Sequence, residues 1–575
     1  MLTKAKNETA LPKPLRLWPG VVIVVLQWVL RYILPQIVPD ALQIGVLAVG
    51  AGGLGIIIWW VFFSRAAWVD RLGAIVLMVL AMIGTRQIVH KSIAQEGMGV
   101  GFFVLAIPVL CLAFVAWAAA SRRLAPRCQR VKMVATILLA CGGWALVRTG
   151  GFTHSFDNDF AWRWSKTPEQ KLIAASHNKP LSSPPHVIAP ETDADWPGFR
   201  GAKRDGIVHG SQINIDWTAT PPEELWRRPV GPGWSSFAVH DNLVYTQEQR
   251  GEDEVVSCYN LVNGASVWLH KDKARFWEAN AGAGPRGTPT YRDGCIYTLG
   301  ATGIVNVLDA TDGSVIWSRN AANDTGAKTP MWGFSASPLV TDDVVIIAAA
   351  SSLIAYDLTS GDILWTNLAE GDSYCSPYIF TIDSVPQIPF LRKSGVVSVS
   401  PADGTQLWEH AWAGYPIVQP ALTDDGDLLV SVEEAIGLRR LAVKRASTNW
   451  TVEERWTSLD LKPYFNDSVI HNGYVYGFRG SSLACLNVAD GTRAWKGGRY
   501  GRGQFILLAD QDVLLVLAEK GDLALVKAVP DQFTELARIP AIKGKTWNHP
   551  VLVGDILLLR NGQEMAAFRV AKAVS

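Results

Sequence analysis

Clustered cysteines are absent from this chain of 575 residues. Its seven cysteines form no CxxC, no CxxCH and no adjacent Cys-Cys pair. These absences argue against attached haem, an iron–sulfur cluster and a structural zinc, which all need grouped thiolates. A strong net charge is absent too, at +1, so the composition gives no reason to expect a nucleic acid as partner. We expect seven free, buried thiols.

Apolar residues are concentrated in the first 150 positions. Five segments there are long and apolar enough to cross a bilayer: 18–37, 41–63, 72–89, 98–120 and 131–147. A cleaved signal peptide does not explain the first segment, because four more follow it. We therefore predict an all-α five-helix transmembrane domain over residues 1–149.

The flanking charges predict an orientation. The first and third loops carry only two cations, Arg86 and Lys91, whereas the tail and the other loops carry eleven. Those eleven are Lys4, Lys6, Lys13, Arg16, Arg65, Arg71, Arg122, Arg123, Arg127, Arg130 and Lys132. The positive-inside rule then places the N-terminus in the cytoplasm. Five crossings put the remainder on the periplasmic side of a bacterial inner membrane.

One charged residue, Arg31, lies inside the first segment. A long arginine stem can reach the headgroups, which is one reading. In the other reading, Arg31 joins Arg86, His90 and Lys91 in an outer-leaflet quinone site. His90 is the only histidine among residues 1–150, so no haem-ligand pair is present in this part of the sequence.

A linker follows over residues 150–194. The aromatic and arginine-containing run 160–164, FAWRW, suits the membrane interface as an aromatic collar. It could instead dock on the next domain. Residues 179–190 are rich in proline, which predicts a stiff extended tether.

A short pattern recurs through the rest of the chain. In residues 303–317, GIVNVLDATDGSVIW, a strand leads to a turn containing Asp309 and Gly313 and then to Trp317. The same steps of four residues recur in Asn260/Gly264/Trp268, Asp357/Gly361/Trp365, Ser400/Gly404/Trp408 and Asn487/Gly491/Trp495. The long interval before the last copy predicts a degenerate copy near 441–456. A second apolar phrase precedes each copy and occurs eight times.

Eight units of about 40–50 residues have the period of propeller blades. We predict an all-β eight-bladed propeller of four-stranded antiparallel blades over residues 195–575. Each tryptophan should pack between two blades, over the glycine turn of the next one. We expect the ring to close by pairing residues 564–570 with a strand near the start of the domain.

The Asx-x-x-x-Gly-x-x-x-Trp pattern resembles the tryptophan-docking motif of the pyrroloquinoline quinone (PQQ) propeller superfamily. Residues 195–206, DWPGFRGAKRDG, resemble the opening signature of its bacterial PQQ-repeat branch. Quinoprotein dehydrogenases in this superfamily bind PQQ and Ca²⁺, and some carry five N-terminal spans. The propeller lipoprotein of outer-membrane β-barrel assembly has eight blades and works through protein contacts. Both relatives imply a site or surface at the funnel of the ring.

Residues before each blade should face that funnel, and they include more Trp, Arg, Glu and His than turns need. If PQQ binds, Trp277 or Trp332 could stack on it, and Arg286 could meet a carboxylate. His549 is a further candidate contact. The metal candidates are Glu278, Asn280 and Asp372, and the candidate bases are Asp372 and Asp467.

Two functions follow from these observations. The first is a membrane-anchored extracytoplasmic propeller that binds a ligand or an envelope protein as a scaffold. The alternative is a PQQ- and Ca-dependent sugar or alcohol dehydrogenase that donates electrons to membrane quinone. Membrane lipid is an expected partner in both.

Overall fold

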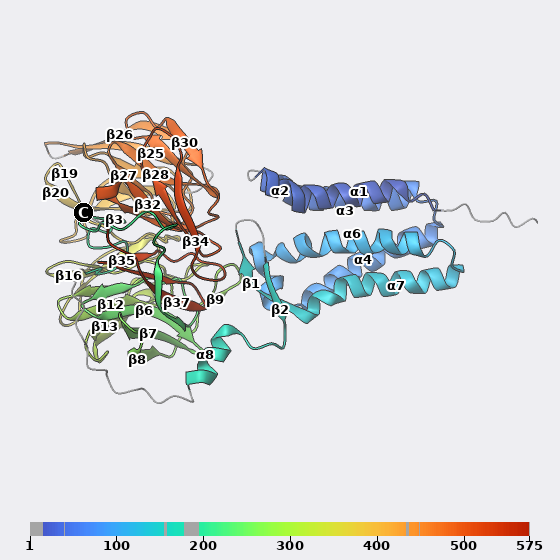
Figure 1. The fold of residues 1–575 in the computed structure, drawn as a ribbon, viewed down its shortest axis with the longest axis horizontal. Helices are drawn as coiled ribbons and strands as arrows, with labels where there is room; N and C mark the ends of the chain where they lie inside the picture. The colour runs from blue at the N-terminus through green and yellow to red at the C-terminus, as the bar shows by residue number, and fades with distance from the viewer. Residues whose placement is uncertain are drawn as a thin grey trace, which may run out of the picture. The chain divides into compact units, whose positions relative to one another are not determined.

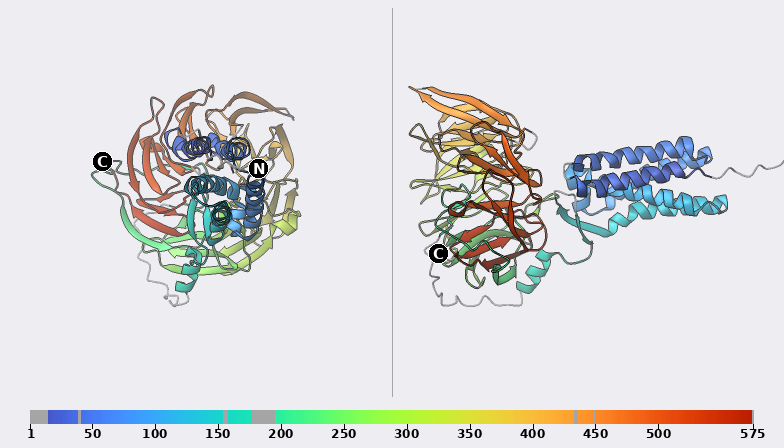
Figure 2. Two further views of the ribbon diagram at one scale, coloured as in Figure 1. Left: turned by 90° about the vertical axis from the view of Figure 1, so that its right-hand side faces the viewer. Right: turned by 45° about the horizontal axis from the view of Figure 1, so that its top comes forward.

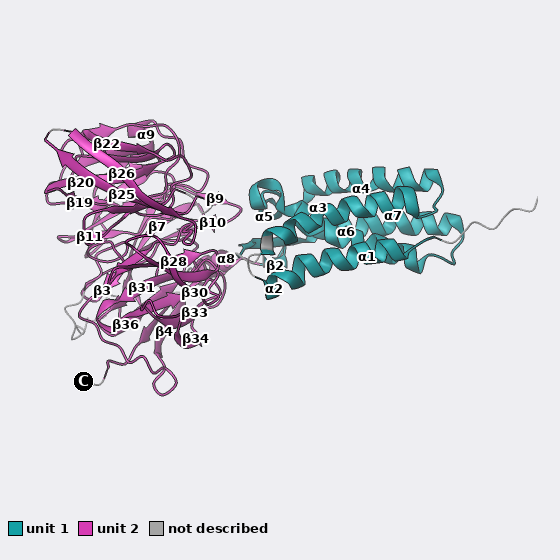
Figure 3. Ribbon diagram, turned by 90° about the horizontal axis from the view of Figure 1, so that it is seen from above, with its two compact units in different colours: residues 1–165 teal, residues 166–575 magenta. Residues whose placement is uncertain are grey.

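A computed structural model describes residues 15–38, 41–153, 158–176, 195–432, 436–447 and 449–573. The chain divides into two compact units, residues 1–165 and 166–575 (Figure 3). The prediction of an extended tether at 179–190 lies outside the described residues, as do Lys4, Lys6 and Lys13.

The first unit is a bundle of helices (Figure 1). Its main helices are α1 (Trp18–Trp28), α2 (Leu34–Ile37), α3 (Leu42–Ile58), α4 (Trp68–Ile88), α5 (Lys91–Ala94), α6 (Gly101–Ala120) and α7 (Pro126–Gly142). Short π-helical turns follow α1 and α3 at Val29–Ile33 and Trp59–Phe63, and 3-10 turns occupy Glu96–Gly99 and Gly143–Leu146. A hairpin of β1 (Val147–Phe152) and β2 (Asn158–Trp162) ends the unit.

Among the described residues, four helices are long and apolar enough to cross a membrane: Trp18–Ile37, Gln43–Phe63, Trp68–Ile88 and Gly101–Ala120. The prediction of five such segments is corrected at the last one. That segment forms α7, which has 17 residues and carries Arg127, Arg130 and Lys132 in its first two turns. The charges lower its mean hydropathy, although Met133, Ile137 and Cys141 are buried in the bundle.

Aromatic side chains pack together inside the helical unit, near the end where α1 and α4 begin. Trp59 and Trp60 are both almost fully buried, and the Trp60 ring lies 4.8 Å from that of Phe114. Arg31 is also buried, with 4% of its surface exposed. Its guanidinium lies 5.1 Å from the ring of Tyr32. Arg31 is therefore enclosed by this unit.

The second unit is an eight-bladed propeller of antiparallel sheets, which confirms the predicted fold (Figure 1). Blades 1–4 are β5 (Ala238–His240), β6 (Leu243–Arg250), β7 (Asp253–Asn260), β8 (Ser266–Asp272); β11 (Thr290–Arg292), β12 (Cys295–Leu299), β13 (Ile304–Asp309), β14 (Val315–Asn320); β15 (Leu339–Val340), β16 (Val344–Ala349), β17 (Ser352–Asp357), β18 (Ile363–Asn367); and β19 (Phe380–Ile382), β20 (Val385–Arg392), β21 (Gly395–Val399), β22 (Gln406–Ala411). The blades follow one another around the ring in chain order (Figure 2).

Blades 5–8 complete the ring. They are β23 (Ala421–Leu422), β24 (Leu428–Val430), β25 (Leu438–Ala446), β26 (Asn449–Ser458); β27 (Val469–His471), β28 (Tyr474–Arg479), β29 (Ser482–Asn487), β30 (Arg493–Gly497); β31 (Gln504–Leu508), β32 (Val513–Leu517), β33 (Asp522–Lys527), β34 (Glu535–Pro540); and β35 (Val551–Val553), β36 (Ile556–Arg560), β37 (Glu564–Arg569), β4 (Glu223–Pro229). Outside the blades lie β9 (Trp277–Glu278), β10 (Gly282–Ala283), α8 (Pro168–Ser176), α9 (Ala321–Thr325) and a 3-10 turn at Ala509–Gln511.

The ring closes as expected, because β4 pairs with the C-terminal β37. One blade differs from the predicted four strands: β3 (Ile207–Val208) adds to β31 in parallel and makes blade 7 five-stranded. This strand comes from the start of the propeller sequence, so both additions tie the two ends of the unit together.

The repeated tryptophans lie where the sequence places them. A Cβ added at Gly361 would lie 2.6 Å from the Trp317 ring, so only glycine lets the two blades approach this closely. The Trp317 indole also donates to the carbonyl of Leu358, at 2.8 Å. The same contact joins Trp268 to Gly313. These tryptophans hold neighbouring blades together.

All seven cysteines are free, but not all are buried. Cys128 is exposed near the start of α7, and Cys295 at the start of β12 is half-buried. Both positions lie at the end of an element, where the packing is incomplete.

Candidate functional site

An axial strap, residues 195–208, crosses the middle of the ring. Arg204 donates to the carbonyl of Pro338 at the start of blade 3, at 2.8 Å. Arg200 donates to the carbonyl of Ser468 at the start of blade 6, also at 2.8 Å. A segment that contacts both blades must cross the central channel. The sequence that resembles an opening signature therefore fills part of the channel.

A buried polar cluster lies beside the strap and contains two predicted site residues. Asp467 Oδ2 lies 3.7 Å from His549 Nε2 and 3.8 Å from Arg200 Nε. Asp467 Oδ1 accepts a hydrogen bond from the backbone N–H of Gln419, at 2.7 Å. Burial raises the pKa of Asp467, and Arg200 opposes that shift. Burial, with Arg200 nearby, lowers the pKa of His549 to about 3, so this imidazole is neutral at pH 7.

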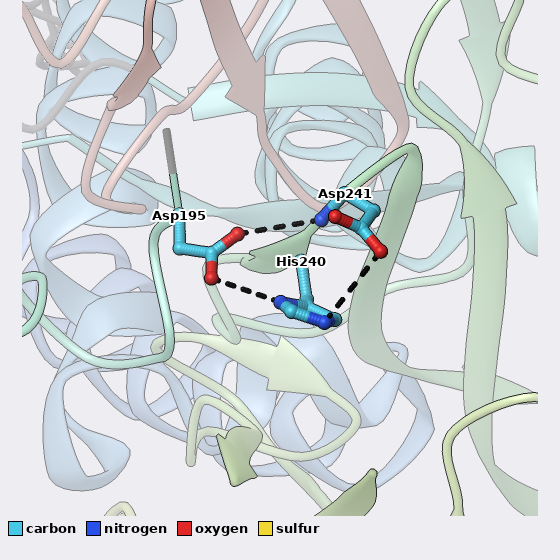
Figure 4. A group of neighbouring side chains, drawn as sticks. All are labelled: Asp195, His240 and Asp241. Carbon is cyan, nitrogen blue, oxygen red and sulfur yellow. Dashed lines mark hydrogen bonds and ion pairs between the residues drawn. The ribbon is translucent and has the colours of Figure 1, made fainter. Parts of the chain in front are cut away.

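The start of the strap is held by a second polar group (Figure 4). His240 Nδ1 lies 2.9 Å from Asp195 Oδ2, and His240 Nε2 lies 3.6 Å from Asp241 Oδ2. The His240 ring stacks on Tyr291 with centroids 3.9 Å apart. The possible ligand atoms of Asp195, His240 and Asp241 all lie within 4.8 Å of one another, close enough to hold a metal ion. Both carboxylates are exposed, and their contacts with the imidazole already account for the arrangement.

An aromatic band lies at the end of the ring where the first strand of each blade begins. Its six rings contact one another in series, with centroid separations between 4.9 and 6.3 Å. The members, in order, are Trp234, Trp547, Phe465, Tyr464, Trp332 and Tyr374. They come from five blades, and all but the last are half-buried. The band therefore presents a partly accessible aromatic surface at the channel mouth.

Two cations lie against this band. Lys545 Nζ lies 4.3 Å from the Trp547 ring and 5.4 Å from that of Trp234. The Arg502 guanidinium lies 3.9 Å from the Tyr464 ring. The Trp547 indole donates to the buried carboxylate of Glu519, at 2.8 Å. The mouth thus combines flat apolar faces with positive charge, a combination that binds aromatic, anionic or protein groups.

Glu278 and Arg286, predicted for a metal site and for a cofactor contact, lie together at the β9–β10 hairpin, where Glu278 ends β9 and Arg286 follows β10. The side chains are 3.4 Å apart. Arg286 also donates to the carbonyls of Gly282, at 3.0 Å, and Gly284. It packs on Phe276, and burial lowers the pKa of Arg286 to about 10. The guanidinium is therefore enclosed by its own loop.

The same turn shows which oxygen atoms of Glu278 and Asn280 are available to a calcium ion. The Glu278 oxygens accept from the N–H groups of Asn280, at 2.7 Å, and Ala281, at 2.6 Å. The Asn280 carbonyl accepts from Lys545, at 2.7 Å. Each oxygen keeps a lone pair, but the guanidinium of Arg286, at 3.4 Å, already neutralises this carboxylate and competes with a cation for it. Glu278 is therefore held by its own turn and by Arg286, and its role as a calcium ligand stays a prediction.

Two of the remaining predicted residues, Trp332 and Asp372, lie at the band or next to it. Trp332 belongs to the band, and Asp372 raises the pKa of Tyr374 through a hydrogen bond and its charge, secondary to burial of the phenol. Trp277 is half-buried in β9. The structure joins Glu278 to Arg286 and Asp467 to His549. It places Asp372 with Tyr374 instead of with Glu278.

Sequence reasoning missed Lys545, Arg502, Glu519 and Arg200. The first two lie just before the first strand of a blade, and Lys545 is four residues before the predicted His549. Their charge at that position was the available signal. Nothing in the local sequence of Arg200 indicates that its partner lies 268 residues away.

Comparisons with known proteins agree with this fold. A family model described as outer membrane protein assembly factor BamB matches residues 252–414. The chain is 28% identical over 219 residues to the outer membrane protein assembly factor BamB of Shewanella oneidensis, covering 37% of this chain and 52% of that protein. It is 24% identical over 230 residues to tetrathionate hydrolase of Acidithiobacillus ferrooxidans, covering 36% and 43%. The chain thus spans about half the length of these two curated relatives.

Among solved structures, the quinohemoprotein alcohol dehydrogenase of Comamonas testosteroni superposes with a TM-score of 0.50. The identity is 12%, and the match covers 71% of this chain and 85% of that one. Such a likeness establishes a shared propeller fold. The resemblance to the PQQ-like propeller repeat is confirmed.

Proposed function

We propose that this protein is a membrane-anchored scaffold whose propeller binds a partner protein of the cell envelope through the aromatic band. The observation that carries this proposal is the band itself, with Lys545 and Arg502 against its rings. Tryptophan, tyrosine and arginine dominate the energetic centres of protein interfaces. The likeness to an outer membrane assembly factor supports an envelope partner.

The proposed topology places the propeller outside the cytoplasm of a bacterial inner membrane. It requires α7 to cross together with the four apolar helices. α7 is about 25 Å long and the 3-10 turn after it adds about 8 Å, so roughly 20 Å remain for the hydrocarbon core once the charged first two turns of α7 lie among headgroups. Arg130 pairs with Asp70 of α4 at 2.7 Å, at that same end. An enzyme reporter that is active only outside the cytoplasm should be active after Ser575; an inactive one would reverse the orientation.

A photo-cross-linking amino acid at Met331 tests the scaffold proposal. Met331 is 58% exposed and precedes Trp332 in the band. In intact cells, this probe should form a defined adduct with one envelope protein. Adding Trp547→Ala should reduce the adduct severalfold, because Trp547 contributes to the same surface.

The matched control places the probe at Leu364, which is 52% exposed and lies in β18, the outer strand of blade 3. Equal adducts at both positions would argue against a specific interface. If Trp547→Ala leaves the yield of the Met331 adduct unchanged, the partner does not bind through the aromatic band.

A second candidate is a PQQ- and Ca-dependent sugar or alcohol dehydrogenase that donates electrons to membrane quinone. The cations against flat rings favour it, because PQQ is a planar tricarboxylate: Trp547 or Trp332 could stack on it, with Lys545 and Arg502 near its carboxylates. When bound, PQQ would supply the two-electron redox chemistry. Titrating the purified protein with PQQ and Ca²⁺ should then give quinone absorbance and dye reduction; no binding at micromolar PQQ removes this candidate.

A further inference from the structure

The contact between blades 4 and 5 breaks the tryptophan-to-glycine repeat. Trp365 packs on Gly404, and Trp456 packs on Gly491. Between them, Trp408 reaches no glycine turn in blade 5. Its indole donates instead to Gln387 of its own blade, at 2.5 Å.

The reason is the shape of blade 5. Its outer hairpin has strands of nine and ten residues, β25 and β26, whereas the corresponding strands of blade 3 have six and five. The longer hairpin replaces the short glycine turn. Trp450 and Val452 of β26 pack against the core that contains Trp408.

A groove of about 580 Å³ opens at this contact. It is lined by residues 407–411 of β22 and by Asn449, Trp450 and Val452 of β26. Its volume is in the range of clefts that accept organic ligands and peptide segments, roughly 300–1,000 Å³. Both walls are terminal strands of their sheets, since β22 pairs only with β21 and β26 only with β25 in the described part of the chain.

The free edge of β22 offers a row of backbone groups. The N–H of Trp412 bonds to Ser394, which continues the ladder with β21. Because the direction alternates along an antiparallel strand, the N–H groups of Glu409 and Ala411 point the other way, toward the free edge. Another extended strand is the natural complement of such an edge.

The charged side chains that line the groove determine which extended peptide segments suit it. Glu409 is exposed and is the one carboxylate among the lining residues. The facing cation Arg439 is already paired with Glu454, at 3.2 Å. His410 lies 3.1 Å from that same Arg439, which disfavours a second positive charge on the imidazole. Arg392 of β20 also acts electrostatically on Glu409, but its guanidinium is bonded to Ser351 and Asn367, so the exposed carboxylate of Glu409 is the position in the groove that complements a cationic side chain.

We propose that this groove binds an extended segment of a partner protein, which adds as a strand to the free edge of β22 and places a lysine or arginine opposite Glu409. Trp450 and Val452 form an apolar wall for the alternate side chains of that segment. The surface is separate from the aromatic band.

Proline substitution tests the edge directly. Glu409→Pro removes an N–H that faces the groove while leaving the bonds to β21, which is where edge strands tolerate proline. The matched control is Thr366→Pro, one residue after Trp365 in β18 and equally exposed. Short random peptides displayed on phage would be selected on the full-length protein in detergent, and the recovered peptides measured against each variant.

We expect cationic extended peptides that bind wild type and Thr366→Pro alike and lose about tenfold or more in affinity with Glu409→Pro. Bound peptide should slow hydrogen exchange of the amides in β22. Should Glu409→Pro fail to fold, Glu409→Lys serves instead, and it should switch the preference from cationic to acidic peptides.

Four results would overturn the proposal. One is the recovery of no peptide above background. Another is equal weakening by both proline variants. The third is protection from hydrogen exchange at the aromatic band in place of β22. The fourth is a dimer of this chain that forms in a concentration-dependent way and is lost with Glu409→Pro, which would assign the edge to a second copy.

Discussion

Replacing Gly361 with alanine tests whether close approach of tryptophan and glycine holds the blades together. Gly361 has a φ of 71°, in the left-handed region. The added methyl group would lie 2.6 Å from Cδ2 of Trp317, so the ring must move. The substitution therefore carries a backbone cost and a packing cost.

A second glycine separates the two costs. Gly294 has a φ of 77°, but a Cβ there would meet no heavy atom within 4 Å. Gly294→Ala should cost only the left-handed strain, about 1–2 kcal/mol. Gly361→Ala adds overpacking of about 1–3 kcal/mol. Unfolding entropy is about 2 cal/mol/K per residue, so a propeller of roughly 400 residues loses about 1 °C in Tm per kcal/mol.

The assay is thermal unfolding of each variant in detergent, followed by tryptophan fluorescence. We expect Gly361→Ala to melt about 1–3 °C below Gly294→Ala, in line with that packing cost. Gly404→Ala should behave like Gly361→Ala, because its Cβ would lie 2.5 Å from Trp365. Equal melting temperatures for Gly361→Ala and Gly294→Ala would refute the idea that the indole and the glycine turn are in tight contact.

Three further changes give distinct readouts. Arg560→Gln removes a fully buried guanidinium that bonds from blade 8 to blade 1, where the ring closes. We expect the free energy of unfolding to fall by about 3 kcal/mol and proteolysis of the native protein to become faster. Burial raises the pKa of Glu254 to about 7, so its contribution to stability is full below about pH 4.5 and is lost as the pH rises through 7; Glu254→Gln should flatten the decline in Tm between these values. Glu169→Gln weakens a two-bond pair with Arg275 that holds α8, and it should speed hydrogen exchange in α8 while changing the global stability by less than about 1 kcal/mol.

The sequence predicted what the repeat imposes on every blade. Five of the eight junctions use the same close contact of a tryptophan with a glycine turn, so Gly313, Gly361 and their tryptophans recur at fixed spacing. The closing pair of β4 and β37 also followed, because a ring must join its ends. These features are local patterns repeated many times, and the repetition allows them to be predicted from the sequence alone.

The site residues were harder to predict because their partners are distant or unexpectedly close. Arg286 bonds to Gly282 and Gly284 of its own loop, which no spacing rule indicates. Arg200 bonds to a carbonyl in blade 6, and Arg204 to one in blade 3, so the strap's position depends on the whole ring. The helix α7 shows a third limit, because charges at its start lower the hydropathy of a segment that still packs in the bundle.

In such a ring, we expect partners to bind where the tryptophan–glycine repeat is interrupted or where side chains lie outside it. At the five junctions where a tryptophan packs on a glycine turn, both residues are taken up by the contact between blades. At blade 5 the glycine turn is missing, and a groove with a free strand edge takes its place. At the channel mouth, the rings of the aromatic band precede the blades and are not needed by the docking contact. The strap fills part of the central channel between these features, so partners that meet this propeller should do so at the mouth or the rim.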